Sequence, residues 1–431
     1  MSTTTSRWRT GIPTVLAIGS LLLILFATLT PRGATLVALQ PSHFCLWCGP
    51  SRATDAIANV VLFVPLGASL VLLGMTVRTA VAVCATLAFG IELTQSMGVP
   101  TGRIASASDF LTNSAGAAAG ALLATWRHTI AFPRKRAAVA LVSGWTIACS
   151  ALLIATAWAV SAPSPLPSAA AVLPATSALP FTPGFGWYAG EIAGTLVDDV
   201  EFPHRGTGPM IVQVPRKTRH IARVAIVGRD ARGGLVPILY AHAPNEGAAH
   251  YIVAQRGRDA LLRGESRAGT LGLAPLDLIV PDAFVERSMG LSDTTLATAR
   301  VSGRALELTV SRGAERWSGL LLRTPTVGWT LIQSLVGVSS RPAAALTALW
   351  LIMLTLPLGY WGWWCRRARA GAIIGSVIIV SACLTTSVRA FGISDPPPWQ
   401  WYTMLAGIAL GMLVAQLLMT RPIERRDNLH A

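Results

Sequence analysis

Six polar residues lie in otherwise apolar stretches of the first third of the chain, and their side chains could bind a ligand or transfer protons. These residues are Asn59, Glu92, Gln95, Arg103, Asp109 and Asn113. The two acid–amide pairs are spaced by three and four positions, so the members of each pair share one face of a helix. Ionisable side chains inside membrane-spanning helices are costly, and they mark candidate functional sites.

Three roles are open for these six residues. Buried amides and an Arg–Glu pair can fasten helices together without any ligand. The same groups can form a binding site for a lipid-linked or glycopeptide-like molecule, or Glu92 or Asp109 can act as an acid or base. Glu92 needs a partner at this depth, and Arg103 is the nearest cation in the sequence. This proximity predicts a bidentate ion pair between Glu92 and Arg103.

The elements that must position these residues are membrane-spanning helices. The chain has 431 residues, a mean hydropathy of +0.54 and only 13% charged residues, about half the share in a soluble domain. Apolar runs long enough to cross a bilayer recur about eight times. They are Ile12–Leu29, Ile57–Gly74, Val77–Ser96, Ser108–Trp126, Ala137–Val160, Ala343–Trp364, Gly371–Arg389 and Trp401–Thr420. All six polar residues then fall near the outer membrane surface.

Short basic clusters alternate along the chain and predict its orientation. The formal net charge of +15 is divided among these clusters and forms no single patch, so nucleic acid is excluded as a partner and membrane lipid is expected. Both termini are predicted to be cytoplasmic, and residues 161–342 extracytoplasmic. The clusters that fall inside are Arg78, Arg134–Arg136, Arg366–Arg369 and Arg421–Arg426.

Residues 184–325 are predicted to form an extracytoplasmic all-β domain between the fifth and sixth spans. A Pro/Ala/Ser-rich stretch over residues 161–183 precedes it and is typical of a stiff linker. Short runs rich in β-branched residues then follow at a spacing that favours a β-sandwich or jelly roll. The seven clearest runs are Met210–Val214, Ala222–Val227, Val236–Tyr240, Tyr251–Ala254, Leu278–Val280, Leu306–Val310 and Gly319–Leu322. The domain's length and acidic start resemble the concanavalin-A-like, laminin-G-type jelly roll.

The polar residues carry a resemblance to the VanZ-like family over about residues 12–160. The run Asn59–Gly67 is similar to the family pattern N..LF.PLG, and the later polar residues are similar to E..Q, then R, then D...N..GA..G. The family shows a second acidic residue beside its Asp, whereas Ser108 and Phe110 flank Asp109 here, which puts a paired-carboxylate role in doubt. The resemblance implies a five-helix membrane domain over residues 1–160, and the family's namesake is associated with teicoplanin resistance. Residues 326–431 are predicted to form a separate three-helix membrane domain, and comparison of the two helical blocks shows no internal repeat.

Cys45 and Cys48 fall in the first outer loop, where an oxidising exterior favours a disulfide. A redox pair and half of a zinc site remain as alternatives. The chain has no second CxxC pair, no HExxH motif, no phosphate loop and no dinucleotide fingerprint, so neither a metal site nor a cofactor is predicted.

The sequence predicts a polytopic α-helical membrane protein that binds or handles a cell-envelope component. A lipid-linked glycan, peptidoglycan or a glycopeptide is the expected ligand, with a link to glycopeptide antibiotic resistance. One alternative is a membrane enzyme that acts on a lipid-linked substrate, with Glu92 or Asp109 as acid or base. The other is a membrane scaffold without a ligand.

Overall fold

The structure is a computed structural model, and it describes most of the helical and strand regions. The predicted Cys45–Cys48 disulfide lies outside the described residues. The described residues are 4–31, 52–101, 103, 105–162, 169–174, 187–188, 191–198, 200–202, 210–213, 219–227, 231–232, 235–242, 249–284, 294–332 and 340–420.

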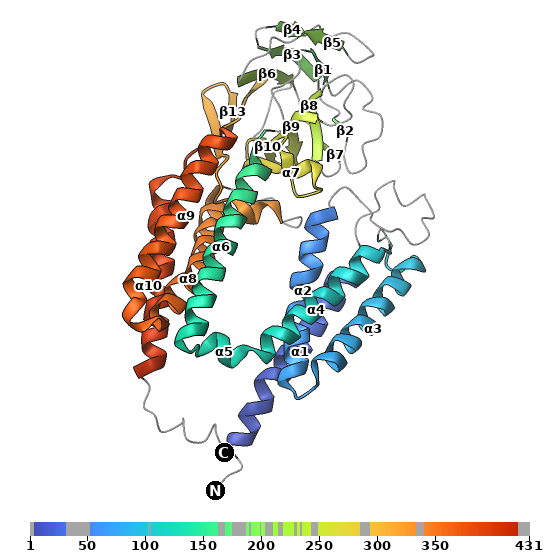
Figure 1. The fold of residues 1–431 in the computed structure, drawn as a ribbon. Coiled ribbons are helices and arrows are strands. Elements are labelled where there is room, and N and C mark those ends of the chain that lie inside the picture. Colours follow the sequence, from blue (N-terminus) through green and yellow to red (C-terminus); the bar gives the residue numbers. More distant parts are fainter. Residues whose placement is uncertain are drawn as a thin grey trace. The chain divides into compact units, whose positions relative to one another are not determined.

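The chain divides into two units, and the first consists of residues 1–133 with the short pieces 271–274 and 332–334. Figure 1 shows its helices in blue and cyan. They are α1 (Thr4–Leu29), α2 (Arg52–Leu72), α3 (Val77–Ser96), α4 (Ala107–Thr125) and the short α5 (Arg127–Ala131). A small apolar core that includes Ile24, Phe63 and Cys84 joins α1, α2 and α3, and Ala117 of α4 completes it.

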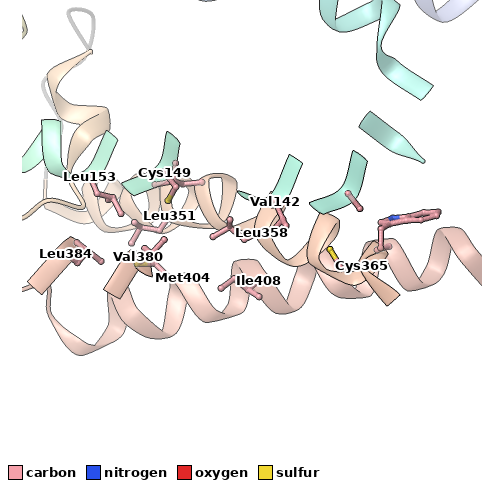
Figure 2. Close-up of a cluster of buried hydrophobic side chains, with 14 residues drawn as sticks. Val142, Cys149, Leu153, Leu351, Leu358, Cys365, Val380, Leu384, Met404 and Ile408 are labelled. Carbon is pink, nitrogen blue, oxygen red and sulfur yellow. The ribbon is translucent and has the colours of Figure 1, made fainter. Parts of the chain in front are cut away.

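The second unit contains four long helices and all the strands, over residues 134–270, 275–331 and 335–431. The helices are α6 (Lys135–Val160), α8 (Ser340–Trp364), α9 (Arg369–Phe391) and α10 (Pro398–Thr420). Their facing sides form an apolar cluster that includes Leu153, Leu358 and Ile408 (Figure 2). Helix α6 therefore packs with the C-terminal helices.

The chain is a multi-pass membrane protein. Within the described residues, seven helices are long and apolar enough to cross a bilayer, namely α1, α2, α3, α6, α8, α9 and α10. The remaining predicted span, Ser108–Trp126, is helix α4. It is not among the seven, and two polar residues, Asp109 and Asn113, lie in its first two turns. It nevertheless packs along α2, which is one of the seven.

The strands form two six-stranded antiparallel sheets and one two-stranded sheet. One sheet has the order β11 (Leu276–Val280), β10 (Asp259–Gly264), β9 (Ala249–Arg256), β8 (Leu235–His242), β1 (Ala169–Pro174) and β5 (Met210–Gln213). The other has the order β14 (Glu315–Leu322), β13 (Ala305–Arg312), β12 (Thr294–Ser302), β6 (Arg219–Val227), β3 (Glu191–Val197) and β4 (Val200–Phe202). The small sheet pairs β2 (Trp187–Tyr188) with β7 (Ala231–Arg232).

The two large sheets pack face to face, which confirms the predicted β-sandwich. A methyl group built on Gly319 of β14 would lie 3.0 Å from side-chain atoms of Leu278 and Val280 in β11. Residues alternate between buried and exposed along β12 and β13, as expected for strands with one face in a core. All seven predicted runs fall on strands. Strand β1 lies within the stretch predicted as a linker, and it pairs with both β8 and β5.

A buried arginine joins the β-sandwich to the helices of the second unit. Arg323 follows β14, is 1% exposed, and donates 2.9 Å hydrogen bonds to the carbonyl oxygens of Val160 and Glu265. Val160 is the last residue of α6. Burial lowers the pKa of Arg323 from 12.5 to about 10, although the charge of Glu265 opposes this shift. The guanidinium therefore remains protonated at neutral pH.

Candidate functional site

Glu92 is buried where the end of α3 meets the start of α4. It is 2% exposed, and its Oε2 accepts a 2.7 Å hydrogen bond from the backbone N–H of Ser106. Ser106 immediately precedes α4, and its own hydroxyl makes no capping hydrogen bond. A carboxylate at a helix N-terminus satisfies a free N–H group and interacts favourably with the helix dipole. Glu92 therefore connects α3 to the first turn of α4.

Gln95 and Arg103 serve a different helix end. The amide nitrogen of Gln95 donates a 3.1 Å hydrogen bond to the carbonyl of Thr28, in the last turn of α1. The guanidinium of Arg103 donates to the carbonyls of Ala27 and Thr30. Carbonyls in the last turn of a helix have no partner within the helix, and a cation there interacts favourably with its dipole. These two side chains therefore hold the end of α1.

The predicted ion pair between Glu92 and Arg103 is not formed. The Glu92 carboxylate accepts a backbone N–H of α4, whereas the Arg103 guanidinium donates to carbonyls of α1. The prediction of this ion pair rested on closeness in the sequence. Backbone groups at two helix ends compete for both side chains, and the prediction did not take them into account. Ser106 was missed as a partner. Ser106 stands just before a turn that contains Asp109, and this sequence is typical of a helix N-terminus with free backbone N–H groups.

Asn113 is the most unusual residue of the cluster. It is 1% exposed, and its Oδ1 has no hydrogen-bond partner among the residues that the structure describes. Asp109 lies about one turn before it on the same helix face. The carboxyl groups of Asp109 and Glu92 interact electrostatically. Buried polar atoms are nearly always hydrogen-bonded, so an orphan acceptor requires an explanation.

Helices α2 and α4 run parallel and approach closely enough to place Asn59 beside this face. A methyl group built on Gly116 or Gly120 of α4 would overlap the backbone carbonyl of Val60 or Val64. Because Asn59 precedes Val60, and Asn113 precedes Gly116 by three positions, the two amides lie within about one turn of each other along the pair. Asn59 and Asp109 are both half-buried. We call Asn59, Asp109 and Asn113 the α2/α4 polar face.

The α2/α4 polar face is suited to hydrogen bonding. Carboxylate and amide oxygens accept hydrogen bonds from hydroxyl and N–H groups. In the described part of the chain, no group of three or more His, Cys, Asp or Glu residues could hold a metal ion. The arrangement therefore favours a ligand rich in hydrogen-bond donors.

Comparison with known proteins finds a family match within the first unit. Residues 3–128, which span α1 to α4 and the first residues of α5, match the family model VanZ/LLP1. This match confirms the resemblance carried by the Asn59–Gly67 run and the later polar residues. No curated protein and no solved structure matches the chain. The concanavalin-A-like assignment of the β-sandwich accordingly stays a prediction.

Proposed function

We propose that the VanZ/LLP1 segment binds the sugar–peptide part of a lipid-linked cell-envelope component at the α2/α4 polar face. The buried, unpartnered Oδ1 of Asn113 is the observation that carries this proposal. An acceptor left unsatisfied away from water costs about 1–3 kcal/mol, and a ligand hydroxyl or amide N–H would recover that cost. Sugars and peptides supply both kinds of donor. A link to glycopeptide resistance follows if the bound component is the one that glycopeptides recognise.

The arrangement of the cluster separates its supporting residues from its binding residues. Glu92, Gln95 and Arg103 already make hydrogen bonds that hold helix ends, so they position the unit. Asn113 has the unused hydrogen-bonding capacity. This division supports binding over a scaffold without a ligand. The neighbouring carboxylates of Glu92 and Asp109 support a second proposal, a membrane enzyme in which one of them acts as acid or base.

Replacing Asn113 with alanine tests the binding proposal. The purified variant is expected to bind the lipid-linked disaccharide-pentapeptide precursor of peptidoglycan at least tenfold more weakly, which corresponds to about 1.4 kcal/mol. Cells that produce the variant are expected to lose any change in teicoplanin susceptibility that the wild-type protein confers, at equal protein abundance. Both effects are expected because alanine lacks the Oδ1 acceptor to which the ligand would donate a hydrogen bond.

Ser114→Ala is the matched control for this experiment. Ser114 is the next residue of α4, and its hydroxyl donates to the carbonyl of Phe110 within the same helix. It should bind the precursor as the wild type does. Wild-type binding by Asn113→Ala would rule out the site. Conversion of the precursor by the wild type, abolished by Glu92→Gln or Asp109→Asn, would favour the enzyme.

The binding proposal requires the polar cluster and the β-sandwich to face the cell envelope. We propose that both termini are cytoplasmic and that residues 161–342 are extracytoplasmic, because the basic clusters alternate in that way along the chain. Reporter fusions after Arg136 and after Arg256 are expected to report a cytoplasmic and an external location, respectively. A cytoplasmic signal from the fusion after Arg256 would contradict this orientation.

A further inference from the structure

The helix pair α8/α10 repeats the close packing of the pair α2/α4. A methyl group built on Gly411 of α10 would overlap the carbonyl of Leu356, and one on Gly359 of α8 would overlap the carbonyl of Ile408. In the first unit, Gly120 meets Val64 and Gly67 meets Ala117 in the same manner. Each pair is parallel, with one intervening helix between its members. Glycines at three corresponding positions therefore allow the same backbone approach in both pairs.

The sequences of the two pairs agree in the same register. The run Pro65-Leu66-Gly67 of α2 recurs as Pro357-Leu358-Gly359 of α8. The run Ala115-Gly116 with Gly120 in α4 recurs as Ala406-Gly407 with Gly411 in α10. This register also places Ala107 on Pro398, which are the first residues of α4 and α10. The same alignment of the two helix pairs therefore matches both their sequences and their glycine contacts.

Burial follows the same alignment. The buried residues of α4 include Asn113, Gly116, Ala117, Gly120 and Ala124. The aligned positions of α10 are also buried, and they are Met404, Gly407, Ile408, Gly411 and Ala415. The intervening helices differ, because α3 packs on α4 whereas α9 packs on α6 and α8. The correspondence therefore belongs to the helix pairs.

The aligned positions differ at the α2/α4 polar face. Leu351 occupies the position of Asn59, and Met404 occupies the position of Asn113. Both are buried in the apolar cluster of the second unit (Figure 2). The two helix pairs therefore pack in the same way, although α2/α4 has polar residues at these positions and α8/α10 has apolar ones. Amides at these positions are not needed for the helices to pack.

The position of α10 that corresponds to Asp109 contacts the segment that follows the β-sandwich. Gln400 aligns with Asp109, is buried, and accepts a 2.5 Å hydrogen bond from the hydroxyl of Thr326. Thr326 belongs to the segment that leaves the β-sandwich. Just before α10, the backbone N–H of Ser394 donates to the carbonyl of Arg323 in the same segment. The start of α10 thus contacts the segment that follows the sandwich. The corresponding start of α4 contains residues of the α2/α4 polar face.

We infer that α8/α10 is a second copy of the α2/α4 pair, and that this copy holds the β-sandwich instead of a ligand. Its amides have been replaced by apolar residues, and its remaining polar position contacts the sandwich. The repeat also indicates a role for two residues of the first unit, and this part of the inference rests on the proposed function. Since α8/α10 packs closely with apolar residues at these positions, the packing of α2/α4 does not account for Asn59 and Asn113, and we assign these amides to binding.

Exchanging residues between the copies tests the inference in the full-length protein. The double variant Asn59→Leu/Asn113→Met gives the first pair the residues of the second, and its Tm in detergent is expected to equal or exceed that of the wild type. Gly116→Ala serves as the comparison, and it is expected to lower the Tm by about 4 °C or more because its methyl group overlaps the carbonyl of Val60. A double variant destabilised as much as Gly116→Ala would overturn the repeat.

Gln400→Leu tests whether the second copy holds the sandwich. It is expected to raise hydrogen–deuterium exchange in residues 324–331 while exchange in β10 stays unchanged, and unchanged exchange throughout would overturn this role. The proposed function fails separately. A stable Asn59→Leu/Asn113→Met variant that still binds the peptidoglycan precursor would leave the repeat intact and remove the binding site.

Discussion

Replacing Arg323 with methionine is expected to destabilise the attachment of the β-sandwich to the helices by about 3–5 kcal/mol. The guanidinium makes charge-assisted hydrogen bonds to the carbonyls of Val160 and Glu265, and methionine leaves these oxygens without their donor. Each lost bond of this kind costs roughly 1.5–3 kcal/mol. Hydrogen–deuterium exchange of the full-length protein should show faster exchange around residues 160–162 and 323–331.

Arg304→Met is the matched control for this measurement. Arg304 lies close to Arg323 in the structure, because its backbone carbonyl accepts the N–H of Arg323, but its side chain is exposed. The control should exchange as the wild type does. Equal exchange in both variants would mean that the guanidinium does not hold the sandwich in place.

Replacing Gly120 with leucine is expected to destabilise the first unit by about 3 kcal/mol or more. A Cβ at this position would overlap the carbonyl of Val64 and would lie 3.0 Å from the backbone nitrogen of Ala68. Backbone atoms cannot move aside as a flexible side chain can, so α2 and α4 must separate. Thermal unfolding in detergent measures the loss, and binding should fall with it because separation moves Asn59 away from Asn113.

Gly90→Leu controls for the added bulk and helix propensity. Gly90 lies in α3 with no atom within 4 Å of a built Cβ, and it is exposed. Leucine favours a helix by about 0.8 kcal/mol over glycine, so this variant should be as stable as the wild type or more so. A similar loss of Tm in both variants would show that close helix approach is not the cause.

Much of the architecture was predictable because it depends on local patterns. The apolar runs gave the helices, and the β-branched runs from Met210 to Leu322 gave seven strands of the sandwich. Strand β1 was not predictable, because a Pro/Ala/Ser-rich composition is typical of a linker. Its pairing with β8 and β5 is supplied by partners distant in the sequence. Tertiary pairing therefore overrode local composition at this strand.

The candidate site was predictable in its residues but not in its contacts. The spacing placed Glu92, Gln95, Asp109 and Asn113 on helix faces as the structure has them. It could not show that Glu92 and Arg103 reach different helix ends, because that depends on where α1 stops relative to α3. Backbone groups at helix ends are invisible in a list of side chains, yet they are the partners of both residues.

The repeat was also missed by comparing the two helical blocks as sequences. The two helical blocks contain five and three predicted spans, whereas the shared element is a pair of helices with a variable helix between them. Only short runs such as Pro-Leu-Gly are retained, and such runs are common in membrane helices. Contacts at Gly120 and Gly411 revealed the alignment, because close backbone approach restricts a position more strictly than hydrophobicity does.

The strand order of the sandwich constrains when it can form during synthesis. Strand β1 is made first, but its neighbours in the sheet are β5 and β8, and the edge strand β14 of the facing sheet ends only at Leu322. The sheet that contains β1 is complete only after β11 ends at Val280, and the facing sheet only after β14 ends at Leu322. Long-range pairing of this kind is slow and leaves unpaired strand edges exposed. Newly made chains should consequently depend on chaperones while α8 is still being synthesised.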